Sequence, residues 1–402
     1  MKTKIYAEVL EPEALNQFYN AMKLDCSLQG ALMPDAHTGY ALPIGCVWKT
    51  DNKIFPSAVG YDIGCGMSAI QTDIKEFTEN DLEKLKTEIL KVIPLGRDTQ
   101  KRRMQLPRIY LGISDVAKDV FLHLADKQLG TLGGGNHFIE IGTDKQGYLN
   151  IVIHSGSRGV GKKIAEYYMK EAAINDVDKA RYEAEFESKN DWYEKNPEKY
   201  EKAKAEFVYR RTRARVDIEG LFGFDINSVM GRAYINDLNE ALQFALDNRQ
   251  TMIDNILLCM ESVFDRKIIT SRFINRNHNH AEIDEQGHVI HRKGATHAED
   301  GMLGVIPGNM RDGSFIVQGK GNPESMSSSS HGAGRVLSRR KAKDTLSVED
   351  FHCAMEGICT NHTDETIDES PDAYKSIFEV MELQKDLVEV IDYIKPVLNI
   401  KG

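Results

Sequence analysis

Glycine-rich strand sequence lies in both halves of this 402-residue chain, and it limits the possible folds more than any other feature. Residues 28–72 alternate short apolar runs with glycines, and residues 270–335 return to the same pattern. Apolar runs separated by glycine predict strands joined by tight turns. Residues suited to chemistry occur in both regions, and no repeat or linker divides the chain convincingly. We therefore predict one α+β domain over residues 1–402, built from mixed sheets with surrounding helices.

Helical sequence lies between and after the two strand regions. Thr78 and Asp81 form a capping-box pattern that begins a helix, which ends at Pro94. Ser347 begins another helix that ends near Gly357. Apolar residues near helical spacing predict two longer helices, over 229–264 and 373–395, with the second ending at Pro396. Strands are expected at 109–113, 149–154 and 397–400.

Residues 162–220 differ in composition from the rest of the chain. Lys, Glu, Ala and Tyr dominate this segment, and Asn196-Pro197 predicts a break between two charged helices. Because the segment has little apolar face, we predict a charged helical arm or insertion, either exposed to solvent or used as a platform.

Composition and charge restrict where the protein acts. No run of 18 apolar residues is present and no apolar signal core follows the first residues, so we expect a cytoplasmic protein with no membrane segment. The six cysteines are scattered without a CxxC pair and are expected to be reduced thiols. A net charge of −10 argues against a large non-specific nucleic-acid surface. Local basic grooves remain possible at residues 101–103, 210–215 and 339–343.

His331 is the strongest candidate for a catalytic residue. It follows four serines and precedes Gly332-Ala333-Gly334-Arg335. Glycine lets backbone N–H groups approach an anion, and arginine offers a fork of donors to phosphate. The segment therefore predicts a phosphate cradle with a titratable ring at its edge, and we interpret His331 as a nucleophile. The alternative is an exposed histidine in a Ser/Gly loop.

Potential metal ligands occur on five segments, four of which contain glycine. Carboxylate, thiolate and imidazole groups on separate segments, with turns that let backbones approach closely, are what a divalent metal site requires. Turn residues and buried core histidines are the alternative explanation for any one segment. The segments are 34–40, 59–67, 133–140, 154–159 and 278–280.

Residues 156–163 fit the GxxxxGK pattern of a P-loop, after a strand and before a helix. Lys163 stands where a Ser or Thr hydroxyl would hold Mg²⁺, so we do not predict a P-loop. Arg158 and the backbone N–H groups of this segment remain candidates for binding a phosphate.

Together these segments resemble the RtcB family of GTP-dependent RNA ligases, in its bacterial type. The resemblance runs from Pro34 to Lys401-Gly402 and omits only the variable arm near 165–220. One departure is the segment 309–313, Asn-Met-Arg-Asp-Gly, where the family usually reads Ser-Met-Gly-Thr. The matching stretches are Asp35-x-His37-x-Gly39, Asp62-Ile63-Gly64-Cys65-Gly66, Gly134-Gly135-Asn136-His137-Phe138, His154-Ser155-Gly156-Ser157-Arg158-Gly159, His291-Arg292-Lys293-Gly294-Ala295 and Ser330-His331-Gly332-Ala333-Gly334-Arg335.

The resemblance implies a role for individual residues. His331 would attack the α-phosphorus of GTP and carry GMP. Asp35 and Arg158 would lie near the RNA ends. Two Mn²⁺ ions would be held by Asp62, Cys65, His137, His154 and His278, with Cys65 shared. The GTP site would be formed by Asn136, His137, Phe138, Ile139, Glu140, His278, Asn279, Pro307, Gly308, Asn309, Met310, Ser314, His331, Gly332, Ala333, Gly334 and Lys401.

The implied reaction joins an RNA 3′-phosphate or 2′,3′-cyclic phosphate to a 5′-hydroxyl, in RNA repair or tRNA splicing, and an archease-type activator is a possible partner. Two alternatives stay open. One is a metal-dependent phosphodiesterase or phosphatase that acts on RNA ends without nucleotide. The other is a non-catalytic RNA-binding scaffold. A nucleotidyl-lysine type of ligase is disfavoured because the sequence contains no KxDG.

Overall fold

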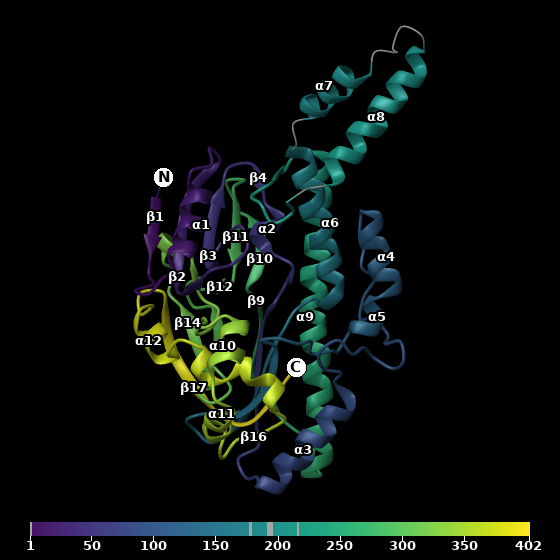
Figure 1. Cartoon of the computed structure of the whole chain (residues 1–402). Helices are drawn as coiled ribbons and strands as arrows, with labels where there is room; N and C mark the ends of the chain where they lie inside the picture. Colours follow the sequence, from purple (N-terminus) through teal and green to yellow (C-terminus); the bar gives the residue numbers. More distant parts are fainter. Residues whose placement is uncertain (1, 177–178, 191–195, 215–216) are drawn as a thin grey trace.

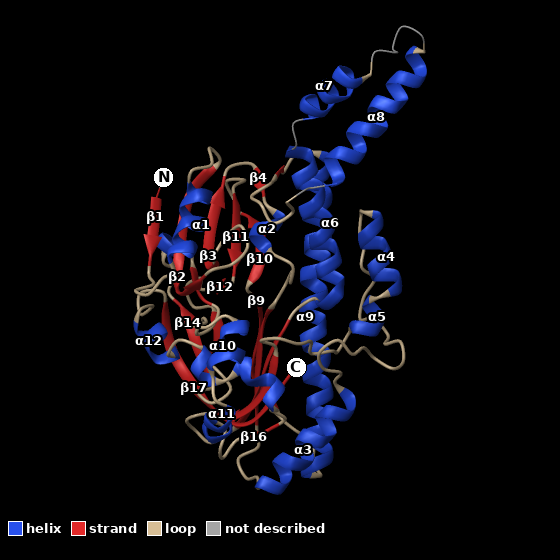
Figure 2. Ribbon diagram, viewed as in Figure 1, coloured by secondary structure: helices blue, strands red, loops and turns tan. Residues whose placement is uncertain are grey.

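The computed structural model of the chain describes residues 2–176, 179–190, 196–214 and 217–402, and it has two main sheets with helices packed beside them (Figures 1 and 2). The larger sheet has the strand order β13-β14-β17-β6-β7-β5-β9, with β16 beside β17. Its strands are β5 (Gly66–Thr72), β6 (Phe138–Thr143), β7 (Leu149–Ser155), β9 (Thr270–Asn277), β13 (Leu303–Pro307), β14 (Ser314–Gly319), β16 (Cys359–Thr360) and β17 (Val388–Lys401).

The second sheet has the order β1-β2-β3-β11-β10 and lies beside the first. Helix α1 (Pro12–Met22) covers one face, where Phe18 packs with Leu32 and Trp48. Two strand pairs, β12-β15 and β4-β8, complete the described strands. The bounds are β1 (Lys2–Ile5), β2 (Ser27–His37), β3 (Ile44–Thr50), β10 (Asn279–Ile283), β11 (Val289–Lys293), β12 (Ala295–His297), β15 (Ser328–Ser330), β4 (Lys53–Ile54) and β8 (Phe224–Asp225).

Helix α9 (Val229–Phe264) runs along the body of the protein and connects the helical layer to the larger sheet (Figure 2). Its C-terminal half and α3 (Glu79–Val92) bury Met252 and Leu85 against sheet residues such as Ile139 and Ile151. Its N-terminal half packs with α2 (Pro56–Val59), α4 (Asp115–His123), α5 (Ala125–Gln128) and α6 (Arg158–Asp176). The remaining short helices are α10 (Arg339–Thr345), α11 (Val348–Ala354), α12 (Ile377–Glu382), η2 (Pro323–Ser325), η3 (Asp364–Glu369) and η4 (Pro371–Ala373).

Helices α7 (Lys179–Lys189) and α8 (Pro197–Ala214) project from the body (Figure 1). α8 begins at Pro197, where the sequence predicts a break. Salt bridges hold the pair together, including Arg211 to Glu185 at 3.0 Å. The expectation of little apolar face applies to α7 and α8 but is wrong for the start of the segment, because α6 buries Ile164, Tyr168 and other residues in the core. Arg215, part of a predicted basic segment, lies outside the described residues.

The predicted α+β class is confirmed, as are several element boundaries. The 229–264 helix and the capped helix after Thr78 lie where the sequence predicts them, and β7 matches the predicted 149–154 strand. Two predictions are wrong. Residues 109–113 form a loop, and the 373–395 helix is replaced by η4, α12 and the strand β17. Within the described part of the chain, no helix has both the length and the apolar character needed to span a bilayer.

Candidate metal centre and adjoining pocket

Four of the predicted metal ligands lie at one edge of four neighbouring strands. Cys65 immediately precedes β5, His137 precedes β6, and His278 follows β9, while His154 lies near the end of β7. The antiparallel register pairs His154 with Phe138 on one side and with Met67 on the other. It also pairs Gly66 with Asn277. Because neighbouring strands are about 4.8 Å apart, this register brings side chains from four distant segments together.

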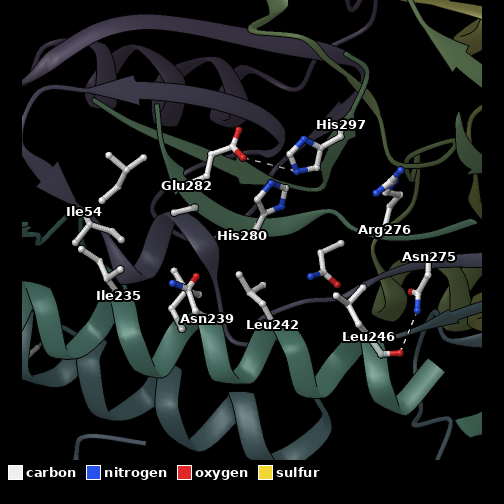
Figure 3. A pocket seen from close by; sticks show the side chains of 14 residues that line it. Ile54, Ile235, Asn239, Leu242, Leu246, Asn275, Arg276, His280, Glu282 and His297 are labelled. Carbon is white, nitrogen blue, oxygen red and sulfur yellow. Dashed lines mark hydrogen bonds and ion pairs between the residues drawn. The ribbon is translucent and has the colours of Figure 1, made fainter. Parts of the chain in front are cut away.

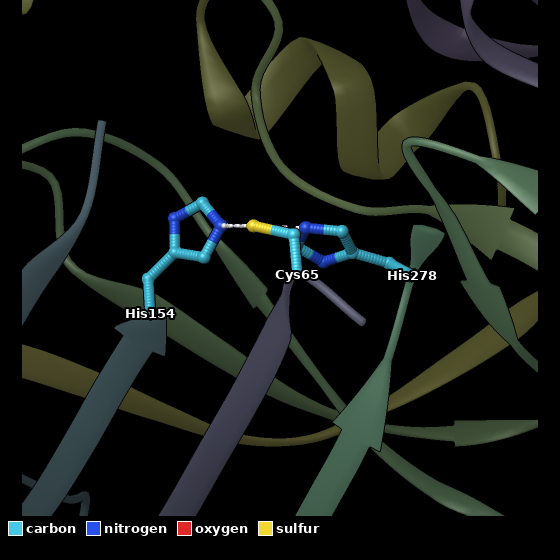
Figure 4. Close-up of side chains that lie close together, drawn as sticks. All are labelled: Cys65, His154 and His278. Atoms are coloured by element: carbon cyan, nitrogen blue, oxygen red, sulfur yellow. Dashed lines mark hydrogen bonds between the residues drawn. The ribbon is translucent and has the colours of Figure 1, made fainter. Parts of the chain in front are cut away.

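The ligating atoms form two groups that share Cys65 (Figure 4 shows the first). In the first, the Cys65 Sγ lies 3.2 Å from His154 Nε2, and His154 Nε2 lies 3.3 Å from His278 Nε2. In the second, His137 Nε2 lies 3.4 Å from Cys65 Sγ and 3.1 Å from Asp62 Oδ2. Each group offers three potential ligand atoms to a cation, and the Cys65 sulfur belongs to both groups.

The donor set fits divalent metals. Burial lowers the pKa values of His154 and His278 well below the ordinary value, so both rings offer a lone pair at neutral pH. Burial raises the pKa of Asp62, but the hydrogen bond to His137 and the charges of His137 and Arg158 together outweigh burial, so the net pKa is lowered and the carboxylate is charged. Burial, followed by the charge of Asp62, raises the pKa of the Cys65 thiol well above its ordinary value. A bound metal deprotonates a coordinating thiol.

Neighbouring backbone groups orient the His137 ring and allow the chain at Gly156 to pass close to Asp62. His137 Nδ1 lies 2.9 Å from the carbonyl oxygen of Leu132, which leaves Nε2 directed at the cluster. Any side chain at position 156 would collide with the Asp62 carboxylate, because a Cβ there would lie 2.3 Å from Asp62 Oδ1.

His331 lies beside this cluster, with its ring centroid 4.8 Å from that of His278. Its Nδ1 atom is 2.7 Å from Oδ2 of the fully buried Asp35. The same oxygen accepts the backbone N–H of His331 at 3.1 Å and of Gly332 at 3.2 Å. Burial raises the pKa of Asp35, but the charge of His331, the hydrogen bond to it and other nearby charges together outweigh burial. The net pKa is lowered, so the carboxylate is ionised. The resemblance implies that Asp35 lies near the RNA ends, and in the structure its carboxylate contacts the His331 ring.

A cavity of about 290 Å³ opens next to His331. It is enclosed by residues from both ends of the chain, and it includes eleven of the residues predicted for the GTP site. Those eleven are Asn136, Phe138, Pro307, Gly308, Asn309, Met310, His331, Gly332, Ala333, Gly334 and Lys401.

The cavity wall carries a dense group of charges. Glu369 is almost fully buried and lies 2.7 Å from Lys401 Nζ, 2.5 Å from an Arg339 nitrogen and 3.3 Å from an Arg335 nitrogen. Burial raises the pKa of Glu369, but Lys401 and Arg339 outweigh it, so the net pKa is lowered. Three cations meet two carboxylates here, because Arg339 also pairs with Asp368 at 2.7 Å, and the group therefore keeps a net positive charge suited to phosphate.

The sequence does not single out three residues of this wall, Glu369, Tyr374 and Asn399. They lie in η3, after η4 and in β17. No local motif surrounds Glu369 or Tyr374. Asn399 lies in the predicted 397–400 strand, but its pairing with Glu140 on β6 depends on a strand register that the sequence does not give.

The other predicted GTP-site residues lie outside the cavity lining. His137 and His278 belong to the metal-ligand cluster, and Asn279 Oδ1 accepts the backbone N–H of Gly294 at 2.7 Å. Ile139 packs in the core on the opposite face of β6. Glu140 of β6 and Ser314 of β14 have buried side chains, and burial raises the pKa of Glu140 to about 8.

Arg158 lines a second cavity, of about 450 Å³, together with Asp62 and His137. Arg97 and Lys162 also line it, and Asn136 contributes to both cavities. Arg158 donates to the carbonyl oxygen of Gly96 at 2.8 Å. The metal-ligand cluster thus has one cationic cavity beside His331 and another beside Arg158.

A third group of potential ligands, His280, Glu282 and His297, lines a separate cavity of about 430 Å³ next to α9 (Figure 3). The guanidinium of Arg292 donates to Glu282 and lies 3.2 Å from His280 Nε2. His297 Nδ1 lies 2.8 Å from Glu299 Oε1. Because a side-chain cation already occupies the centre of this group, we interpret it as an ion-pair network.

A buried cluster of thiol, imidazole and carboxylate groups beside the His331 ring is an arrangement suited to metal-dependent phosphoryl chemistry. Comparison with known proteins identifies the family of the chain. The family model described as "tRNA-splicing ligase RtcB" matches residues 17–120 and 113–402. The chain therefore belongs to the RtcB family.

Individual relatives match over nearly the whole chain. The chain is 35% identical over 421 residues to the RNA-splicing ligase RtcB of Escherichia coli (strain K12), covering 98% of this chain and 95% of that protein. It is 36% identical over 422 residues to RNA-splicing ligase RtcB1 of Escherichia coli (strain ATCC 25922), with the same coverage. The tRNA-splicing ligase RtcB of Nanoarchaeum equitans is 27% identical over 483 residues, covering 99% of this chain and 94% of that protein.

Proposed function

We propose that this protein is an RNA ligase that joins RNA 3′-phosphate or 2′,3′-cyclic phosphate ends to 5′-hydroxyl ends, using GTP and Mn²⁺ through a covalent GMP adduct on His331. The observation that carries the proposal is the position of His331. It lies between a buried carboxylate, a group of metal ligands and a cationic cavity. RNA repair and tRNA splicing are the proposed settings, and the names of the relatives support this class of substrate.

The contact with Asp35 prepares His331 for nucleophilic attack. A proton on Nδ1, facing Asp35 Oδ2 at 2.7 Å, leaves the lone pair on Nε2. Attack by Nε2 on the α-phosphorus of GTP forms the N–P bond and breaks the bond to the β-phosphate oxygen, so that pyrophosphate leaves. As positive charge develops on the ring, the buried Asp35 carboxylate stabilises it, because the two groups are already in contact.

Charged side chains of the cavity would hold the nucleotide phosphates. Lys401, Arg335 and Arg339 already share the single carboxylate of Glu369, so they can donate to a triphosphate at the same place. Asp62, Cys65, His137, His154 and His278 would hold two Mn²⁺ ions, which supply Lewis-acid neutralisation of phosphate charge when bound. By the resemblance, Glu140 of β6 is the candidate acceptor for the guanine N1–H and 2-amino group, which would distinguish guanine from adenine, although its buried side chain does not line the cavity.

The second cavity is the proposed site for RNA ends. Arg158, Arg97 and Lys162 give it positive charge on the other side of Asp62 and His137. An RNA 3′-phosphate bound there would reach the guanylated His331 across the metal-ligand cluster. Its phosphate oxygen would displace the histidine from GMP, and attack of a 5′-hydroxyl on the activated phosphate would then release GMP. An archease-type activator and a cytoplasmic location stay predictions from the sequence.

The test is adduct formation with GTP labelled at the α-phosphate. Protein should first be stripped of metal and reconstituted with Mn²⁺, because a Cys/His site prefers Zn²⁺ and can be purified with the wrong ion. We expect an acid-labile label on the wild type, its disappearance in His331→Ala and its retention in His352→Ala, which changes an exposed histidine elsewhere. Label that survives His331→Ala would contradict the assigned nucleophile. Opening of cyclic-phosphate ends without GTP and without adduct would instead support a phosphodiesterase.

A further inference from the structure

Two neighbouring side chains of α9, Asn248 and Arg249, are fully buried behind the metal-ligand cluster. Their hydrogen bonds run to residues beside the ligands rather than to the ligating atoms. Neither side chain lines a cavity of the site, so neither is part of the binding surface described above.

The Arg249 guanidinium reaches three strands at the edge where the ligands lie. One terminal nitrogen donates to the carbonyl oxygens of Gly64 at 2.9 Å and Ser155 at 2.8 Å. The other terminal nitrogen donates to Asn277 Oδ1 at 2.7 Å. Each of these acceptors belongs to the immediate neighbour of a ligand, and the three ligands are Cys65, His154 and His278.

The remaining guanidinium nitrogen of Arg249, Nε, contacts side chains within β5 and β9. Nε donates to Asn275 Oδ1 at 2.8 Å and to Ser68 Oγ at 3.2 Å. Asn275 in turn donates to the carbonyl oxygen of Leu246 on α9 at 3.0 Å. All three guanidinium nitrogens are therefore used, and β5, β7 and β9 are held at fixed distances from one helix.

Asn248 connects α9 to the fourth ligand through the loop before β6. Its Oδ1 accepts the backbone N–H of Gly130 at 2.8 Å, and its Nδ2 donates to the carbonyl oxygen of Thr131 at 3.1 Å and to Ser155 Oγ at 3.3 Å. The Ser155 hydroxyl donates to the carbonyl oxygen of Leu132 at 2.7 Å. That carbonyl also accepts from His137 Nδ1, so the orientation of the His137 ring depends on this chain of contacts.

We propose that Asn248 and Arg249 are positioning residues that set the geometry of the metal centre from behind. The inference rests on the proposed metal function and assigns it residues that no motif marks. Arginine is required at 249 because a planar fork with donors in three directions satisfies acceptors on three strands at once. A lysine ammonium keeps the charge but cannot span them.

The test is binding of Co²⁺, used alone as a probe because its visible absorption reports the number and geometry of its ligands. Wild type, Arg249→Lys and Asn248→Asp are each titrated with Co²⁺ after metal removal. Changes behind the ligands of a metal site typically weaken metal affinity by about 10–100-fold. We expect a loss of affinity in that range for Arg249→Lys and Asn248→Asp, with altered absorption bands.

Two further variants separate positioning from general stability. Ser155→Ala removes one hydroxyl from the chain of contacts and should fold, with a severalfold loss of affinity. Asp237→Asn changes another buried polar residue of α9, which lies about 18 Å along the helix from Arg249. Its carboxylate accepts the backbone N–H groups of Ile113 and Ser114. It should lower the melting temperature but leave Co²⁺ affinity and spectrum unchanged.

The outcomes distinguish the two proposals. A wild-type protein that binds no Co²⁺ would refute the metal centre itself. Normal binding by the wild type, with unchanged affinity and spectrum in Arg249→Lys and Ser155→Ala, would overturn the positioning role. An equal loss in Asp237→Asn would also overturn it, because destabilisation of α9 would then explain the effect.

Discussion

Replacement of Glu140 by Gln should make the stability of the protein less sensitive to pH. Burial raises the pKa of Glu140 from the ordinary value of 4.5 to about 8. Its Oε1 atom is buried and has no hydrogen-bond partner among the described residues. Ionisation of this carboxyl is therefore less favourable in the folded wild type than in the unfolded chain, so the folded state loses stability as pH rises. Glutamine cannot ionise and avoids this loss.

The sign and size follow from the linkage between protonation and folding. A raised folded-state pKa means that the stabilising contribution is complete below pH 4.5 and is lost as pH rises towards 8. Each pH unit above 4.5 removes about 1.4 kcal/mol of this stabilisation until the pH reaches the folded-state pKa. The stabilisation lost is therefore about 2 kcal/mol at pH 6 and about 4 kcal/mol at pH 8. The advantage of Glu140→Gln should thus grow by about 2 kcal/mol between these pH values, or about 3 °C in melting temperature for a chain of this length.

Thermal unfolding of wild type and Glu140→Gln at several pH values between 6 and 8 measures this effect. A constant offset between the two proteins does not matter, because only its change with pH reports the carboxyl. The exposed Glu76→Gln serves as the control and should show no such trend. Parallel curves for wild type and Glu140→Gln would refute the reasoning, since Glu140 would then ionise as easily in the folded protein as in the unfolded one.

Three other changes have defined outcomes. Asp35→Asn should slow guanylylation by about 10²-fold with normal metal content, measured by label incorporation, because the nucleophile loses its charged partner. Lys401→Met should raise the KM for GTP about tenfold, while the exposed Lys395→Met on the same strand should not. Gly133→Ala should weaken metal binding by at least about tenfold, because a Cβ there would lie 2.0 Å from a nitrogen of Arg158 and 2.6 Å from Nδ1 of the proposed ligand His137. Gly147→Ala, also at positive φ but in open space, should cost only about 1 kcal/mol of stability and retain metal affinity.

The helices and the ligand-bearing segments could be predicted because their signals are local. The cap at Thr78 and the spacing of apolar residues in 229–264 need no information from other parts of the chain. Cys65, His137 and His154 occur near glycines and His278 lies in a His-Asn-His segment, and the structure brings the four together. What the sequence could not supply was the register that makes four strands end at one edge.

The two incorrect segments failed for different physical reasons. Residues 109–113 alternate as a strand does, but Ile109 and Leu111 are exposed, and α9 holds the backbone, with Asn236 donating to the carbonyl oxygen of Leu111. Residues after 387 have apolar spacing compatible with a helix. Their β-branched residues and their place between β14 and β6 instead favour a strand, and burial alternates from Asp392 to Leu398. The pairing partners that decide this are distant in sequence.

The strand-edge location of the ligands also has a consequence for how the protein matures. Cys65 and His154 are 89 positions apart in the sequence, and His154 and His278 are 124 positions apart. Contacts of such long range form slowly, since the intervening loops must close first. A partly folded chain can therefore offer an ion only isolated side chains, and high-affinity capture of metal must wait until β6, β7, β5 and β9 have paired. Uptake of the ion would then report that this part of the molecule has finished folding.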